Sequence, residues 1–216
     1  EASATDLGAT TADTLTVVSM GAINTSGTLT VAGLGDFKTK NDAGSNITIA
    51  NSSSFGSISA TSRNTADDAN DTGDISLNLA SSTLVSDLVT SGDISLTAAN
   101  TKTLSQDAGS SIITSGLLLL GAGSHDLNLG TNTITTLAAN TGDIIYSDNS
   151  GYAIGTVGAT NGTTSTGDII LRSTGTVTQT QAITANGLKL DGVAGIFSLA
   201  GSNNDVDTLS ASTATV

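Results

Sequence analysis

The 216-residue chain has no proline, no cysteine and no tryptophan, and aromatic residues make up only 2% of it. Without cysteine it can form neither a disulfide scaffold nor a thiolate metal site. A compact globule of this size normally buries more Phe, Tyr and Trp, which dominate core energetics. The core must therefore come from Leu, Ile, Val and Ala. Such residues suit a thin core that needs only ladders of aliphatic side chains.

Positive charge is also scarce, because 19 acidic residues face 6 basic ones and the net charge is −13. The chain lacks the basic footprint that neutralises phosphates, which argues against nucleic acid and anionic lipid. With 37% hydrophobic residues it is not simply disordered. The longest apolar run, around 117–120, is too short for a membrane span, and the segment 1–10 does not resemble a signal peptide. We therefore expect no nucleic-acid partner and no membrane span.

A short repeat runs along the whole chain. Glycine followed by an alternating apolar segment recurs, and most copies follow one another at intervals of roughly 19–26 positions. The segments between turns alternate with period 2, as in "TLTVV" (14–18) and "ITIA" (47–50), which is typical of β-strands. No stretch has a convincing helical period. The glycines that open these segments are Gly27, Gly73, Gly92, Gly116, Gly142, Gly167 and Gly187.

A longer repeat covers the segment 92–216, which holds nearly two copies offset by roughly 70–75 positions. "ITSGLLLLGAGSHDLNL" (113–129) aligns with "ITANGLKLDGVAGIFSL" (183–199), and "GDISL" (92–96) aligns with "GDIIL" (167–171). The segment 1–91 is less regular and contains an acidic loop near 64–74. Because the composition and the short repeat continue along the whole chain, we predict one domain over 1–216.

Short strands between turns also occur in sandwiches and barrels. Two observations favour a parallel β-helix: the short repeat has the length of one coil, and small aliphatic residues can stack in ladders between coils. We predict an all-β fold, a single β-helix of about nine irregular coils, on the order of 45 Å long at the strand spacing of ~4.8 Å. The predicted core ladders contain Ile75, Leu77, Ile94, Leu96, Leu118, Leu120, Ile144, Ile169, Leu171, Leu188, Leu190 and Leu199.

Several phrases resemble repeats of filamentous haemagglutinin-like exoproteins, which Gram-negative bacteria export by two-partner secretion. They include "TLAANTGDIIY" (136–146), "AITANGLKL" (182–190) and "NNDVDTLSAST" (203–213). The resemblance is strongest over 92–216, and the chain shows neither a secretion-domain signature nor a carboxy-terminal toxin. It implies a right-handed parallel β-helix, a location outside the cell or on its surface, and a role in adhesion, aggregation or biofilm formation. The chain would then be a segment of the shaft.

Four Gly-Asp pairs offer candidate chemistry, either as a carboxylate array or as turns. Glycine supplies positive φ and Asp accepts hydrogen bonds from nearby amides, so the pattern favours a structural turn that starts each strand. Stacked coils would place some of these carboxylates about 5 Å apart, where like charges repel. The turn residues are Gly73, Asp74, Gly92, Asp93, Gly142, Asp143, Gly167 and Asp168.

The acidic loop is the best metal candidate, because Asp67, Asp68, Asp71 and Asp74 supply several of the six to eight oxygens that Ca²⁺ takes. The loop lacks EF-hand spacing, and a solvated insertion explains it equally. The single histidine, His125, stands beside Asp126, but adjacent strand residues face opposite ways. The basic residues look scattered and the aromatic residues form no stripe. We therefore expect no catalytic residue, no enzyme and no cofactor except Ca²⁺ at the acidic loop.

The leading functional hypothesis is a structural and adhesive extracellular rod at a Gram-negative cell surface. Its expected partners are copies of itself and cell-surface or glycan receptors. The alternative is a self-polymerising fibre subunit that stacks end to end through open β-helix edges. Two further alternatives are an ice-binding β-helix, suggested by threonine-rich segments such as "TVTQT" (176–180), and a carbohydrate-active β-helix, which the scattered basic and aromatic residues disfavour.

Overall fold

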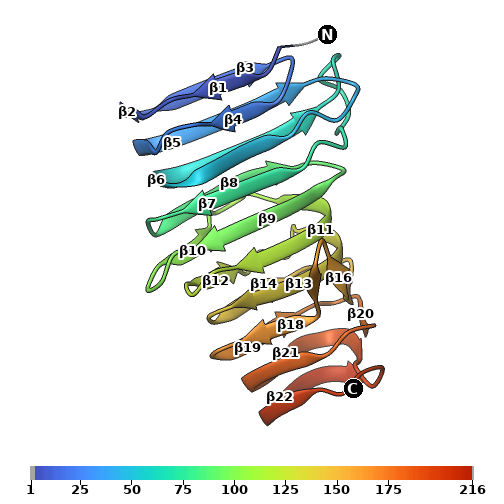
Figure 1. Ribbon diagram of the computed structural model, residues 1–216. Helices are drawn as coiled ribbons and strands as arrows, with labels where there is room; N and C mark the ends of the chain where they lie inside the picture. Colours follow the sequence, from blue (N-terminus) through green and yellow to red (C-terminus); the bar gives the residue numbers. More distant parts are fainter. Residues whose placement is uncertain (1–2, 216) are drawn as a thin grey trace.

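The computed structural model describes residues 3–215, which form strands, turns and bends and no helix. The strands stack along a common axis around which the chain winds, and turns or bends connect most of them (Figure 1). The strands are β1 (Thr5–Leu7), β2 (Thr10–Ala12), β3 (Leu15–Ser19), β4 (Ile23–Thr25), β5 (Leu29–Lys40), β6 (Ile47–Arg63), β7 (Ile75–Leu79), β8 (Thr83–Val89), β9 (Asp93–Ala98), β10 (Thr103–Gln106), β11 (Ile112–Leu120), β12 (Ser124–Leu127), β13 (Thr133–Thr141), β14 (Ile144–Ser147), β15 (Ala153–Ile154), β16 (Thr156–Val157), β17 (Thr160–Asn161), β18 (Thr163–Ser165), β19 (Asp168–Arg172), β20 (Thr176–Gln179), β21 (Ile183–Ser198) and β22 (Asp205–Thr215).

Parallel pairing joins these strands into one stack, which confirms the predicted parallel β-helix. One column of aligned residues runs through Thr5, Ile23, Ile47, Ile75, Ile94, Leu117, Leu137, Ile154 and Gln179. With the last coil the stack has about ten coils. Along this column the shortest coil runs from Leu137 to Ile154, and the longest runs from Ile47 to Ile75 and includes the acidic loop. Both fall outside the predicted range of coil lengths, so the coils vary more than the sequence repeat suggests.

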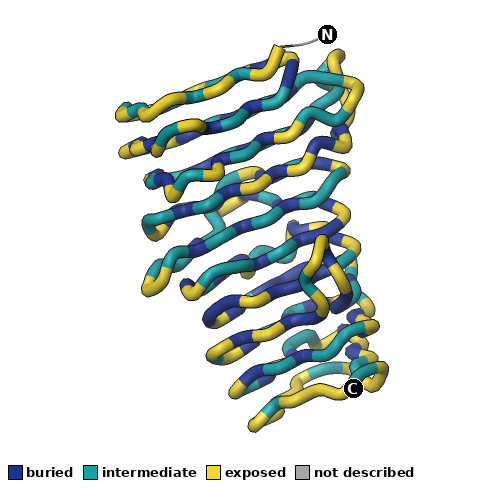
Figure 2. The backbone as a smooth tube through the Cα atoms, viewed as in Figure 1, coloured by how far each residue is buried: buried dark blue, intermediate teal, exposed yellow. Residues whose placement is uncertain are grey.

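The core lies inside the coils and consists of aliphatic ladders. Side chains alternate between buried and exposed along the strands, as in β7, where Ile75, Leu77 and Leu79 face inward. Figure 2 shows this alternation in the middle coils of the stack, whereas the last coil is mostly exposed. Burial of one such side chain stabilises the fold by roughly 1.5–3 kcal/mol. Because each ladder continues into the next coil, the core needs few aromatic side chains.

The predicted core is wrong at two leucines. In β11, Leu117 and Leu119 are buried, whereas Leu118 and Leu120 face outward and are half-buried. The prediction placed these two leucines inside because it aligned Gly116 with Gly92. The structure pairs Gly116 with Asp93, which shifts the inward positions by one residue. Outward Leu118 lines a hollow with Val157, which belongs to the antiparallel hairpin β16–β17 that runs across neighbouring coils (Figure 1).

A reciprocal amide pair occurs twice, once in each copy of the long repeat, and it is partly buried. Gln106 Nε2 donates to Asn132 Oδ1 (2.7 Å), and Asn132 Nδ2 donates to Gln106 Oε1 (2.9 Å). Gln179 and Asn204 form the same reciprocal pair in the second copy. In both copies the Asn Oδ1 also accepts a backbone N–H, from Ile112 and from Ile183. In each copy the pair therefore links two segments of the chain that lie about one coil apart in the sequence.

Candidate functional site

The Gly-Asp pairs form corner columns in which each carboxylate binds the next coil. In the first column, Asn46 Oδ1 accepts from the Asp74 N–H (2.9 Å), and Asp74 Oδ1 accepts from the Asp93 N–H (2.9 Å). The Asp93 carboxylate accepts from the Gly116 N–H in turn. Burial, and then the charge of Asp74, raise the pKa of the Asp93 carboxyl, and the Gly116 bond opposes this shift. These aspartates therefore have a structural role, but the predicted turn chemistry is wrong in detail: each carboxylate caps a backbone donor one coil further along and not an amide of its own turn, and none of the four glycines has a positive φ.

The other two pairs lie in a second column on a different side of the coil. Asp143 Oδ1 accepts from the Asp168 N–H (2.9 Å), and Asp168 pairs with Gly187. The first column instead continues from Gly116 to Thr136 and Ala153. Three full coils and part of a fourth thus separate Asp93 from Asp168. The two copies of the Gly-Asp-Ile motif in the long repeat therefore lie on different sides of the rod.

In the second pair of each column, the glycine makes room for the carboxylate of the preceding coil. A Cβ at Gly92 would lie 2.7 Å from Asp74 Oδ1, and one at Gly167 would overlap Asp143 Oδ1. Glycine is therefore required by close approach, since φ is not positive at either residue. The motif is a device that joins two coils, and no reacting atom needs to be invoked to explain it.

The structure does not bring the four carboxylates of the calcium candidate together. Asp68 Oδ1 accepts from Asn64 Nδ2 (2.7 Å), Asp71 Oδ2 accepts from the Gly44 N–H (2.8 Å), and Asp74 caps Asp93. Asp67 lies among basic side chains. Within residues 3–215, no three metal-ligating side chains of His, Cys, Asp or Glu converge.

The basic residues that look scattered in the sequence meet at Asp67. Lys38 Nζ and Lys40 Nζ lie 3.3 and 3.6 Å from Asp67 Oδ2, and Arg63 Nε lies 3.3 Å from Oδ1. We name Lys38, Lys40 and Arg63 the cation cradle. The hydrogen bond from Lys38 is the main cause that lowers the pKa of Asp67, with the charges of the other cations adding to it. The signal that sequence reasoning missed is the register, which pairs Lys40 with Arg63.

His125 stands in an aliphatic ladder between Leu104 and Ile144 and is 1% exposed. Its Nε2 lies 3.3 Å from the Leu96 carbonyl, which can only accept, so Nε2 carries the proton. Nδ1 lies 3.2 Å from the Thr141 hydroxyl. Burial lowers the pKa of His125 to about 4, opposed by the Leu96 bond. The imidazole is therefore a neutral part of the core, without access to a substrate.

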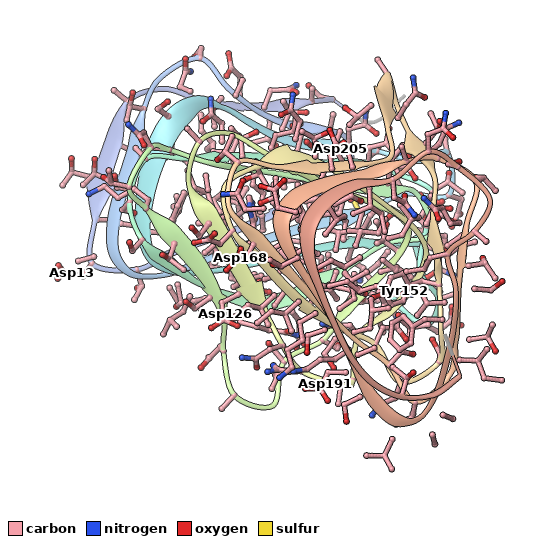
Figure 3. All side chains as sticks on the ribbon, turned by 90° about the horizontal axis from the view of Figure 1, so that it is seen from below. Asp13, Asp126, Tyr152, Asp168, Asp191 and Asp205 are labelled. Carbon is pink, nitrogen blue, oxygen red and sulfur yellow. The ribbon has the colours of Figure 1, made fainter. Side chains whose placement is uncertain are left out.

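Asp148 is fully buried at another corner and was not singled out from the sequence. Its Oδ1 accepts from the Ser150 hydroxyl (2.6 Å) and N–H (2.7 Å), and Oδ2 accepts from the Ile134 N–H (3.0 Å) and the Tyr146 hydroxyl (3.3 Å). Burial, and then the charge of Asp148, raise the pKa of Tyr146. Seen along the stack, Tyr152 lies within the outline of the coils, whereas Asp13 points outward at the edge (Figure 3). These donors satisfy both oxygens of Asp148, so the group anchors a turn.

In the described part of the chain, no helix is long and apolar enough to cross a membrane. The chain was also compared with known proteins. It matches no protein-family model, no curated protein and no solved structure. The family resemblance of the repeats therefore stays a hypothesis, and function must be argued from the architecture and the surface.

Proposed function

We propose that this chain is a structural and adhesive rod segment of a large secreted surface protein, at the outside of a Gram-negative cell. The observation that carries the proposal is the uninterrupted parallel stack, in which one residue column continues through coil after coil. The resemblance of the repeats to haemagglutinin-like exoproteins supports the same role. A protein built this way supplies length and stiffness, and its side surfaces supply contacts.

The proposed mechanism is mechanical and interfacial. Pulling along the axis loads the hydrogen bonds between coils in parallel, and the capped corners add side-chain bonds from Asp74 and Asp143 to the coils that follow them. The net charge of −13 keeps neighbouring rods apart in solution. Adhesion then comes from many weak side contacts that act together.

A self-polymerising fibre subunit is the second candidate, favoured by the two ends of the stack. At one end, Leu188, Leu190 and Leu209 line a groove of about 390 Å³, and Leu209 is 62% exposed. At the other end, Leu7 and Leu15 are only partly buried. A further coil, from a longer chain or from a second copy, would cover these apolar side chains.

Electron microscopy of the purified chain separates these functions. Isolated short rods that make coated beads adhere to cells would support the adhesive rod. Axial filaments whose length grows with protein concentration would favour the fibre subunit. Compact particles without elongation, or rods whose beads do not adhere, would contradict the leading proposal. Beads coated with heat-unfolded chain serve as the control for non-specific stickiness.

A further inference from the structure

Two residues of the cation cradle, Lys38 and Arg63, line a groove of about 430 Å³ on the outer face of β5, β6 and β8, and Lys40 lies beside it, paired with Arg63. The strand register orders its lining. Asp36 pairs with Ser59, Lys38 with Thr61, and Lys40 with Arg63, so acidic, hydroxyl and basic side chains follow one another along the strands. Asp87 of β8 lines the groove as well. The groove therefore has a basic end, a hydroxyl-bearing floor and an acidic end.

One polar group of this groove lacks a hydrogen-bond partner within the described part of the protein. Thr61 Oγ1 is buried and has no hydrogen-bond partner among residues 3–215. A buried hydroxyl without a partner destabilises the protein, so a ligand or a water that binds it is favoured. In contrast, Asp87 Oδ1 already accepts from the Ser111 N–H (2.9 Å). The unpaired hydroxyl thus lies next to the cradle and can accept or donate one bond.

Asp67 reaches the cradle through an unusual backbone conformation. Its φ is 63°, in the left-handed region that non-glycine residues seldom adopt. Arg63 fastens the loop there, since its Nη2 donates to the Asp67 carbonyl (3.1 Å) and its Nη1 donates to Asn70. The loop thereby places a carboxylate among three cations. A carboxylate in this position is what a bound acidic ligand would supply.

We propose that the cradle and groove bind a carboxylate-bearing saccharide, such as a uronic acid, and that Asp67 fills the carboxylate position when no ligand is present. The ligand carboxylate would displace Asp67 and bind Lys38, Lys40 and Arg63. Its hydroxyls would donate to Asp36 and exchange hydrogen bonds with Ser59, and with Thr61 once the buried Thr61 hydroxyl turns toward the groove. This inference rests on the proposed adhesive function, for which it names a partner class and a site.

The test removes the resident carboxylate and measures binding of glucuronate by NMR titration of the full chain. One charge-assisted contact corresponds to roughly a factor of ten in affinity, so Asp67→Asn should bind glucuronate at least about tenfold more tightly than the unaltered chain. Asp67→Gly is the second variant, because glycine adopts this φ without strain. Asp68→Asn is the matched control, since it removes the same charge from the same loop without touching the cradle.

Adding Lys38→Gln to the Asp67→Asn chain should abolish the gain in glucuronate affinity, whereas adding Lys102→Gln should leave that gain unchanged. These two results together would support the site. An equal gain in Asp67→Asn and Asp68→Asn would overturn it, because net charge alone would then explain the binding. Acetate that binds as tightly as glucuronate, or an acidic peptide that binds more tightly, would overturn the saccharide assignment. None of these results changes the rods or filaments seen by microscopy, so the two proposals fail separately.

Discussion

Replacing His125 by leucine should make the rod less sensitive to acid. Leucine suits the ladder, because Leu104 and Ile144 occupy the same position in the neighbouring coils. The pKa of His125 is about 4 in the folded chain, against an unperturbed 6.5. The unfolded chain therefore binds more protons below pH 6.5, and stability falls as the pH drops from there toward 4. The linkage relation gives a loss of about 2 kcal/mol at pH 5 and about 3 kcal/mol at pH 4.

Urea unfolding followed by circular dichroism, at several pH values between about 7.5 and about 4, measures this loss. His125→Leu removes hydrogen bonds to Leu96 and Thr141, so its stability at neutral pH will differ from that of the unaltered chain. The prediction concerns the pH dependence of that difference. The carboxylates titrate in both chains and largely cancel. If both chains lose the same free energy of unfolding between pH 6.5 and 5, then His125 is not the buried neutral group described above.

Four further predictions concern stability. Gly167→Ala should lower the free energy of unfolding by about 1–3 kcal/mol, because the new Cβ crowds Asp143. The same substitution made in an Asp143→Ala chain should lower it by less, as measured by chemical denaturation. Leu119→Ala should cost about 2–5 kcal/mol and the outward-facing Leu120→Ala about 1 kcal/mol or less; equal costs would contradict the strand register. Asn132→Ala leaves buried partners unpaired and should cost roughly 3 kcal/mol, whereas exposed Asn128→Ala should be nearly neutral by the same assay. Chelation by EDTA should leave the melting temperature unchanged, because the loop carboxylates bind protein donors; a fall would indicate a structural cation.

The fold could be predicted because alternation and turn chemistry are local properties. Ile75 and Leu77 are separated by an outward serine, so three consecutive residues are enough to predict that the two apolar side chains face inward. Leu117–Leu120 offers no such contrast, because the hairpin covers outward Leu118 with another apolar side chain. The direction of these leucines depends on which residue of the preceding coil faces Gly116. That residue is Asp93, a whole coil away along the chain, so no local pattern reveals the pairing.

The cation cradle could not be predicted for the same physical reason. Lys40 and Arg63 are also one coil apart, but coil length varies along the stack, so sequence spacing does not fix which side chains lie above one another. The chain then turns back at 64–70 and adds Asp67 from outside the sheet. A carboxylate that reaches its partners through a loop leaves no periodic signal. Charge clusters on this rod must therefore be found from register.

The two corner columns suggest why the Gly-Asp phrase stops after two copies. The first column reads Asn46, Asp74, Asp93, Gly116, and the second ends Asp143, Asp168, Gly187. Two carboxylates about 5 Å apart repel by roughly 0.8 kcal/mol in water, and more when partly buried. A charge-assisted bond to a backbone N–H contributes about 1.5–3 kcal/mol, so a pair of stacked aspartates is still favourable. A third aspartate would place Asp93 between two like charges and would crowd its carboxylate, as a Cβ at Gly116 would. Glycine at that position keeps the backbone donor for the last carboxylate and adds no charge, which ends the column at its most stable length.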